Sequence, residues 1–263
     1  MNVQTAFDKA KAQNRAALIG YLPLGYPDVP GSIEAMQTMV AAGVDAVEIG
    51  IPYSDPVIDG PVIQNASQHA LERGVRTKDV FAAVEAVVSA GAPALVMTYW
   101  NVIEQYGPEA FAADLSAAGG AGLIAPDLLP EEAQDWIAAT DKHELDRVFL
   151  VAPSSTDERV AETAAACRGF VYATAVMGVT GARTQMSNAA PQLVPRVRAV
   201  TDLPVGVGLG VSTAEQAHAV AQYADGVIVG SALVRCLTEA DSLQAGLVEL
   251  RTLTSALAAG VRR

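Results

Sequence analysis

The segment Glu48–Gln64, EIGIPYSDPVIDGPVIQ, decides how the rest of the chain is interpreted. It starts near the end of a short apolar run, Ala46 to Ile49, in which Glu48 is the single carboxylate. It continues into a proline-rich loop with two more carboxylates, Asp55 and Asp59. A carboxylate inside an apolar strand is costly to bury unless it is paired, neutralised or used, because desolvation disfavours its charged form. Glu48 is therefore the first candidate for a functional residue.

The overall composition is that of a globular protein with a large core. The chain has 263 residues, of which 51% are hydrophobic and 17% charged, and its mean hydropathy is +0.27. Barrels of alternating strands and helices commonly reach about 250 residues as one unit, so we expect a single domain over residues 1–263. No stretch approaches the ~20 apolar residues of a membrane span. The first thirteen residues lack the apolar segment of a signal peptide and are predicted to form a short amphipathic helix.

Charge and cysteine content argue against several functional classes. The net charge of -12 disfavours nucleic acid as a partner, because a phosphate backbone requires clustered Lys and Arg. Cys167 and Cys236 lie far apart without metal-ligand spacing around them, so the sequence predicts neither a disulfide framework nor a metal site. We therefore expect a cytoplasmic protein that holds any phosphate through its backbone.

Apolar runs alternate with segments of helical spacing along the whole chain. The runs expected as strands are 18–22, 46–49, 94–99, 122–125, 147–152, 169–173, 204–207 and 225–229. The segments expected as helices include 32–42, 79–90, 108–118, 130–139, 187–199 and 240–259, with capping boxes at Ser155-x-x-Glu158 and Ser212-x-x-Glu215. Eight strand-helix units favour an α/β fold closed as a (β/α)8 TIM barrel, with an open doubly wound sheet as the alternative.

In a barrel of this kind the functional groups gather where strands end and in the loops that follow. The residues with suitable chemistry all occur at such places: Tyr21, Glu48, Asp59, Tyr99, Tyr172, Gly181, Gly210 and Ser231. Six side chains at or near strand ends could line a flat apolar slot: Tyr21, Met97, Tyr99, Ile124, Leu150 and Tyr172. Each of them taken alone is also compatible with plain barrel packing.

Glycine-bearing turns follow the last three expected strands, at residues 178–183, 208–212 and 229–233. A single glycine of this kind is usually an ordinary turn or helix cap. Three in succession indicate a site where backbone N-H groups and a helix N-terminus hold an anion. The sequence GSALVRCL, from Gly230, is typical of the short extra helix at a barrel phosphate site.

The two acids Glu48 and Asp59 are joined by a loop long enough to place them on opposite sides of a pocket. The apolar surroundings of Glu48 should raise its pKa, whereas Asp59, next to Gly60, should stay ionised. Two carboxylates with different protonation states can divide acid and base roles. Alternatively, Glu48 is a structural acid and Asp59-Gly60 a simple turn.

The segment from Glu48 resembles the signature of the tryptophan synthase alpha subunit family, E-[LI]-G-[VI]-P-[FY]-[ST]-D-P-x-x-D-G-P-x-I-Q. Further similarity extends from about residue 18 to residue 231. The resemblance implies a TIM barrel that cleaves indole-3-glycerol phosphate to indole and glyceraldehyde 3-phosphate by a retro-aldol reaction. It implies that Glu48 shuttles protons and that Asp59 stabilises the positive charge at the indole N-H.

The resemblance also implies which residues bind the substrate and the partner. The substrate-binding positions are Tyr21, Tyr99, Tyr172, Thr180, Gly181, Gly210, Gly230 and Ser231. Asp55 and Pro56 match the loop that contacts a beta subunit, which implies an alpha2beta2 heterotetramer that receives the indole. Pyridoxal phosphate is expected only in that beta subunit, because no lysine here lies in an apolar strand run.

Three positions depart from the family's common pattern: Val62 replaces Thr, and Val102 and Leu129 each replace Pro. None of these changes removes a group from the expected chemistry, although loops lose the stiffness of proline. Two rival functions stay open at this point. One is a phosphate-binding barrel isomerase in which the acid pair serves sugar enolisation, and the other is a barrel that mainly regulates a partner without turnover.

Overall fold

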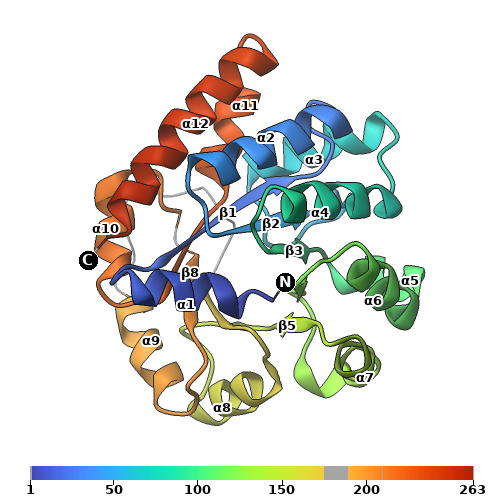
Figure 1. Ribbon diagram of the computed structural model, residues 1–263. Helices are drawn as coiled ribbons and strands as arrows, with labels where there is room; N and C mark the ends of the chain where they lie inside the picture. Colours follow the sequence, from blue (N-terminus) through green and yellow to red (C-terminus); the bar gives the residue numbers. More distant parts are fainter. Residues whose placement is uncertain (1, 175–188, 209, 263) are drawn as a thin grey trace.

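The strands of the computed structural model, which describes residues 2–174, 189–208 and 210–262, belong to one parallel sheet. They are β1 (Ala17–Pro23), β2 (Ala46–Gly50), β3 (Ala94–Met97), β4 (Gly122–Ile124), β5 (Asp146–Val148), β6 (Leu150–Val151), β7 (Val171–Thr174), β8 (Val205–Gly208) and β9 (Gly226–Val229). Their order in the sheet is β5-β4-β3-β2-β1-β9-β8-β7-β6. Only Phe149 separates β5 from β6, so the two ends of this order meet within one divided strand. The predicted barrel is confirmed, with the expected strand 147–152 split in two (Figure 1).

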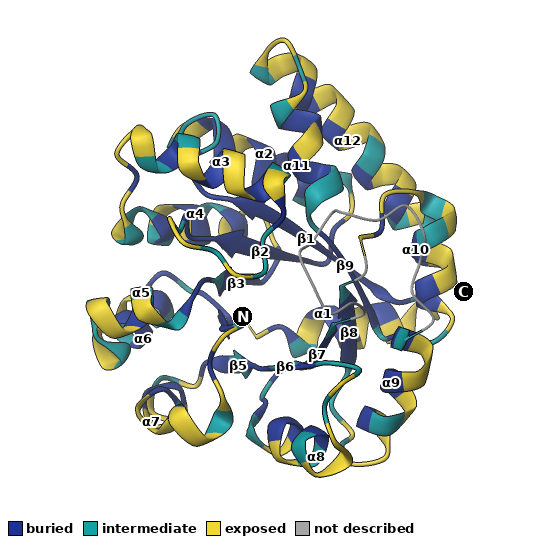
Figure 2. Cartoon of the chain, turned by 180° about the vertical axis from the view of Figure 1, so that it is seen from behind, coloured by how far each residue is buried: buried dark blue, intermediate teal, exposed yellow. Residues whose placement is uncertain are grey.

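Helices surround the sheet, with exposed residues on their outer faces, as Figure 2 shows. The α-helices are α1 (Gln4–Ala12), α2 (Val29–Ala42), α3 (Pro61–Glu72), α4 (Val80–Ser89), α5 (Trp100–Tyr106), α6 (Pro108–Ala117), α7 (Gln134–His143), α8 (Asp157–Ala166), α9 (Ala189–Arg198), α10 (Ala214–Ala221), α11 (Ser231–Thr238) and α12 (Leu243–Gly260). The short 3-10 helices are η1 (Thr77–Asp79) and η2 (Pro130–Glu132). The expected extra helix after Gly230 is therefore α11.

Some predicted helix starts are wrong by a few residues. The helix expected from Pro130 begins only at Gln134, because Pro130 opens η2 instead. The two predicted capping boxes are each displaced by one position, since the N-caps are Thr156 and Thr213. Ser155 instead accepts a hydrogen bond from the N-H of Ala152, the first residue after β6. The local sequence thus predicted that each helix has a side-chain cap. Which of two adjacent hydroxyl residues forms the cap depends on the backbone conformation of the loop before the helix.

Helix α1 packs against the inner core of the barrel at the end where the strands begin. Phe7 contacts Phe170 with ring centroids 5.4 Å apart, and Phe7 belongs to the same buried cluster as Ile19 and Leu95. The N-H of Val3 donates to the carboxylate of Asp146 at 2.8 Å. This docking closes the end of the barrel opposite the predicted active site.

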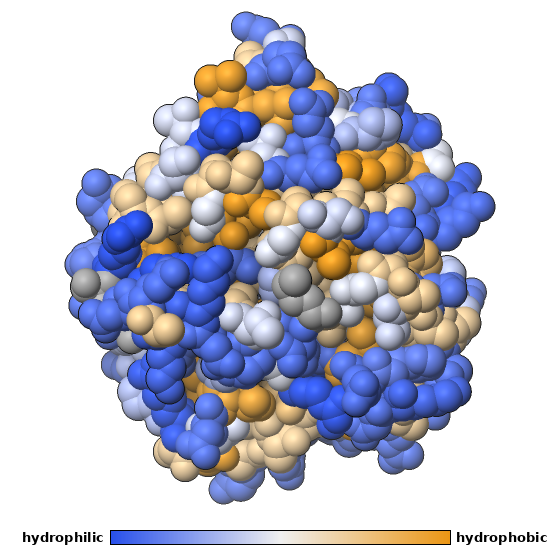
Figure 3. Space-filling view, in the orientation of Figure 1, coloured by the Kyte–Doolittle hydropathy of each residue, from blue (hydrophilic) through white to orange (hydrophobic). Residues whose placement is uncertain are grey.

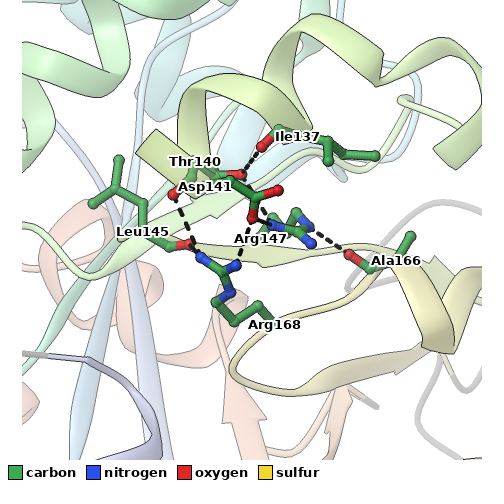
Figure 4. Close-up of polar contacts among 7 residues, drawn as sticks. All are labelled: Ile137, Thr140, Asp141, Leu145, Arg147, Ala166 and Arg168. Atoms are coloured by element: carbon green, nitrogen blue, oxygen red, sulfur yellow. Dashed lines mark hydrogen bonds and ion pairs between the residues drawn. The ribbon is translucent and has the colours of Figure 1, made fainter. Parts of the chain in front are cut away.

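An ion-pair cluster ties the outer helices to the same end of the sheet (Figure 4). Arg147 and Arg168 both bind the carboxylate of Asp141. Arg147 also donates to the carbonyl of Ala166, and Arg168 donates to that of Thr140. Ala166 is the last residue of α8, so Arg147 satisfies a carbonyl that the helix leaves unpaired. The Thr140 carbonyl, in the last turn of α7, also accepts from the N-H groups of Glu144 and Leu145.

The face seen in Figure 3 is largely hydrophilic, with hydrophobic side chains in separate small patches. Within the described residues, no helix has both the length and the apolar character needed to cross a membrane.

Candidate active site

Glu48 lies inside the barrel near the carboxyl end of β2. Its neighbours across the sheet are Tyr21 on β1 and Leu95 on β3. The side chain is 1% exposed, and its Oε1 atom has no hydrogen-bond partner among the described residues. Burial without a compensating partner raises the pKa of Glu48 to about 8. The expected rise in the pKa of Glu48 is confirmed, and with this pKa the carboxyl group is mostly protonated at pH 7.

Asp59 lies in the loop between β2 and α3, and Tyr99 holds it. The Tyr99 hydroxyl donates to Asp59 Oδ2 at 3.2 Å. It also accepts hydrogen bonds from the N-H groups of Val57 and Ile58, both at 3.1 Å. The sequence predicts an ionised Asp59. Burial raises its pKa, and among the described residues the Tyr99 hydrogen bond lowers it. Asp59 is therefore more buried than its place beside Gly60 indicated, because its loop is held by Tyr99, two residues beyond β3.

Tyr21 on β1 and Tyr172 on β7 both lie near the two acids. The pKa of each is raised well above its usual value, first by burial and then by nearby carboxylates that include both Glu48 and Asp59. These four groups and Tyr99 therefore lie around one region at the mouth. The remaining members of the predicted slot also face the barrel interior: Met97, Ile124 and Leu150.

Two glycines make room for the phenol rings, and the sequence reasoning did not identify this role. A Cβ atom on Gly50 would lie 2.3 Å from the hydroxyl oxygen of Tyr21, and one on Gly208 would lie 2.4 Å from that of Tyr172. Both distances are far below van der Waals contact, so neither position accepts a side chain without movement. The period of a strand could have indicated Gly50, because residues two apart such as Glu48 and Gly50 face the same side.

The predicted phosphate residues lie beside this region where they are described. A Cβ on Gly230 would be 3.3 Å from the Tyr21 ring, and the next residue, Ser231, starts α11. Gly210 lies just beyond β8, the strand that pairs with β9. Its φ is +69°, and a Cβ atom added there would have no neighbour within 4 Å. Free N-H groups at the start of α11 suit an anion. Thr180 and Gly181 lie outside the described residues.

The expected partner-contact residues lie on the outer side of the Asp59 loop. Asp55 is exposed and Pro56 half-buried, and the Ser54 hydroxyl donates to the Asp55 carboxylate at 2.5 Å. Val57 follows with 70% of its surface exposed. The loop therefore presents Asp55 and Val57 outward, while Asp59 turns towards Tyr99.

Metal chemistry has no support in the ranges 2–174, 189–208 and 210–262. No group of three or more His, Cys, Asp or Glu side chains there could hold a metal ion. The buried thiol of Cys167 has its pKa raised to about 12 by burial, so it is not a reactive thiolate. The candidate site therefore brings together two acids and three phenols beside the start of α11.

Comparison with known proteins agrees with this arrangement. A family profile described as "Tryptophan synthase alpha chain" matches residues 7–262. The tryptophan synthase alpha chain of Salinispora arenicola is 65% identical over 261 residues, covering 99% of this chain and 98% of that protein. The corresponding chain of Mycobacterium tuberculosis H37Rv is 63% identical over 256 residues, covering 97% of this chain and 93% of that one.

Solved structures give the same result for the fold. A structure of tryptophan synthase from Mycobacterium tuberculosis has a TM-score of 0.94 at 62% identity, covering 99% of this chain and 98% of that chain. The alpha subunit from Legionella pneumophila has a TM-score of 0.87 at 33% identity, covering 99% of this chain and 98% of that chain.

Proposed function

Because the chain belongs to the tryptophan synthase alpha chain family, we propose that it cleaves indole-3-glycerol phosphate with Glu48 and Asp59 as its catalytic acids. The products are indole and glyceraldehyde 3-phosphate, so the protein is a carbon-carbon lyase of tryptophan biosynthesis. The observation that supports these roles most directly is the buried Glu48 carboxyl, with a pKa of about 8. Glu48 and Asp59 both raise the pKa values of Tyr21 and Tyr172, so the two acids lie near the same phenols.

Glu48 supplies and then recovers one proton. A neutral carboxyl at pH 7 donates its proton to C3 of the indole ring, which turns the ring into an electrophilic indolenine cation. The resulting carboxylate then removes the proton of the adjacent glycerol hydroxyl. As the carbonyl forms, the carbon-carbon bond breaks and its electrons restore the aromatic ring. Glu48 ends the cycle protonated again, so the reaction is balanced without another acid or base.

Asp59 acts on the charge that appears at the indole nitrogen. Protonation at C3 leaves that N-H positively charged, and an ionised carboxylate that accepts its hydrogen bond stabilises the cation. The effect is large where water is excluded, because the local dielectric is low. The three phenol-bearing residues Tyr21, Tyr99 and Tyr172 line the ring slot.

The phosphate is bound by backbone groups. Gly210, Gly230 and Ser231, together with Thr180 and Gly181, provide N-H donors and the start of α11. The substrate thereby spans the mouth, with its indole near Glu48 and its phosphate over β8 and β9. This mode of binding suits a chain with a net charge of -12, because it requires no basic cluster.

The partner is a tryptophan synthase beta subunit in an alpha2beta2 heterotetramer, and this chain delivers indole to it. The exposed segment at Asp55 and Pro56 contacts that subunit, next to the loop that carries Asp59. The chain needs no cofactor of its own, because pyridoxal phosphate belongs to the beta subunit. We place the protein in the cytoplasm with the rest of this pathway.

An indole-release assay tests the proposal. The purified chain should form indole from indole-3-glycerol phosphate, and a beta subunit should co-elute with it and accelerate the reaction. Glu48→Gln and Asp59→Asn should each lower turnover by ~100-fold or more without loss of fold. Wild-type turnover in either variant would contradict its role, and sugar isomerisation in place of indole release would favour the isomerase alternative.

A further inference from the structure

We propose that Tyr99 is a positioning residue for Asp59: its hydroxyl fixes the loop backbone and holds the carboxylate in the ionised form that the reaction needs. The inference rests on the proposed role of Asp59 and assigns to Tyr99 a function beyond lining the ring slot. It follows from the hydrogen-bonding capacity of a single oxygen atom.

A phenol oxygen has one proton to donate and two lone pairs with which to accept. Both lone pairs of the Tyr99 oxygen receive backbone N-H groups, from Val57 and Ile58. These amides cannot act as acceptors, so the Tyr99 hydroxyl must donate in the remaining direction, towards Asp59 Oδ2. A donor that cannot turn into an acceptor favours a carboxylate over a protonated carboxyl group.

The Tyr99 side chain has little freedom to move away from these hydrogen-bond partners. Its ring stacks on Tyr53 with centroids 4.9 Å apart and planes at 30°, and the residue is 5% exposed. The backbone is fixed one residue later, where the N-H of Trp100 donates to Asp127 at 2.9 Å. The Tyr99 hydroxyl is thus held over the Asp59 loop by two contacts. One is the stacking of its ring on Tyr53, and the other is the anchoring of the next residue to the loop after β4.

The other titratable groups around Asp59 do not replace this donor. Tyr21 on β1 and Tyr172 on β7 face Asp59 from across the mouth. Glu48 on β2 is buried and neutral at pH 7. Burial raises the pKa of Asp59. Among the described residues, the hydrogen bond from Tyr99 is the interaction that lowers it. Removal of the hydroxyl should therefore shift Asp59 towards its protonated form.

Tyr99→Phe in the full chain is the test, because it removes the hydroxyl and keeps the ring. The matched control is Tyr106→Phe, which removes a phenol that also donates to an aspartate, Asp114, but on the outside of the barrel. Three measurements apply to both variants: steady-state indole release, its pH profile, and hydrogen exchange of the amides of Val57 and Ile58.

For Tyr99→Phe we expect kcat to fall about 10- to 100-fold, the range for loss of a hydrogen bond to a charged group. KM should change much less, since the ring remains. The acidic limb of the kcat/KM profile should move to higher pH, and the two amides should exchange faster. Tyr106→Phe should match wild type in all three measurements.

A wild-type kcat and acidic limb in Tyr99→Phe would overturn the inference, as would a loss confined to KM, which would indicate packing alone. Unchanged protection of the two amides would exclude the backbone grip. If the wild-type chain formed no indole, the proposed function would fail instead, and amide exchange would still decide whether Tyr99 holds the loop.

Discussion

The hydroxyl of Tyr21 fills the space that a side chain on Gly50 would need. A Cβ atom at position 50 would lie 2.3 Å from the Tyr21 oxygen and 2.7 Å from its Cζ atom. Tyr21 is also the register neighbour of Glu48. The absence of a side chain at Gly50 thus leaves room for the Tyr21 phenol beside the buried acid.

Gly50→Ala should therefore destabilise the chain by about 1–3 kcal/mol, the usual cost of overpacking a close-packed interior. Tyr21→Leu introduced with Gly50→Ala should recover part of that loss. Urea unfolding of the wild type, both single variants and the double variant measures the coupling. Additive effects would mean that Tyr21 and Gly50 do not compete for this space.

Ser231→Asp should raise the KM for indole-3-glycerol phosphate by about tenfold or more, because it places a negative charge against the phosphate. Gly210→Asp should do the same, and Asp tolerates the left-handed backbone there better than most residues. Ser242→Asp is the control, since Ser242 caps the start of α12 away from the site. An unchanged KM in the first two variants would remove these residues from the phosphate site.

Glu48→Gln should make the stability of the protein less dependent on pH. The pKa of Glu48 rises from 4.5 to about 8 in the folded chain, so the folded state binds more protons between these values and loses stability as the pH rises through them. One pKa unit corresponds to about 1.4 kcal/mol. Relative to Glu48→Gln, the wild type should lose roughly 3 kcal/mol between pH 5.5 and pH 9, as urea unfolding at each pH would show. A difference independent of pH would contradict the raised pKa.

Phe7→Ala should cost about 3–5 kcal/mol of unfolding free energy, because it empties a buried aromatic position. Phe7 is 4% exposed and packs on Phe170 at the closed end of the barrel. Turnover at a temperature well below unfolding should stay close to wild type, since the acids lie at the other end. Val248→Ala, at a residue 66% exposed, should change stability by less than about 0.5 kcal/mol. A similar cost in both variants would mean that α1 is not packed as described.

Much of the fold could be predicted because its signals are local. The apolar runs at 18–22 and 225–229 became β1 and β9 within one or two residues, since a buried parallel strand requires continuous apolar side chains. Helix α3 and helix α5 were not predicted. Their sequences follow prolines, glycines and aromatic residues, which locally resemble a continuing loop.

The sequence by itself determined the alternation of strands and helices, the burial of Glu48 in β2 and the likeness of its signature to one family. Only the tertiary structure decided that the split at Phe149 completes the barrel, that Gly50 accommodates Tyr21, and that Tyr99 binds the backbone of Val57, 42 residues away. Periodicity and composition indicate which residues share a face of one helix or one strand. Contacts between distant residues depend on the register of the closed sheet, which forms only when all the strands pack together.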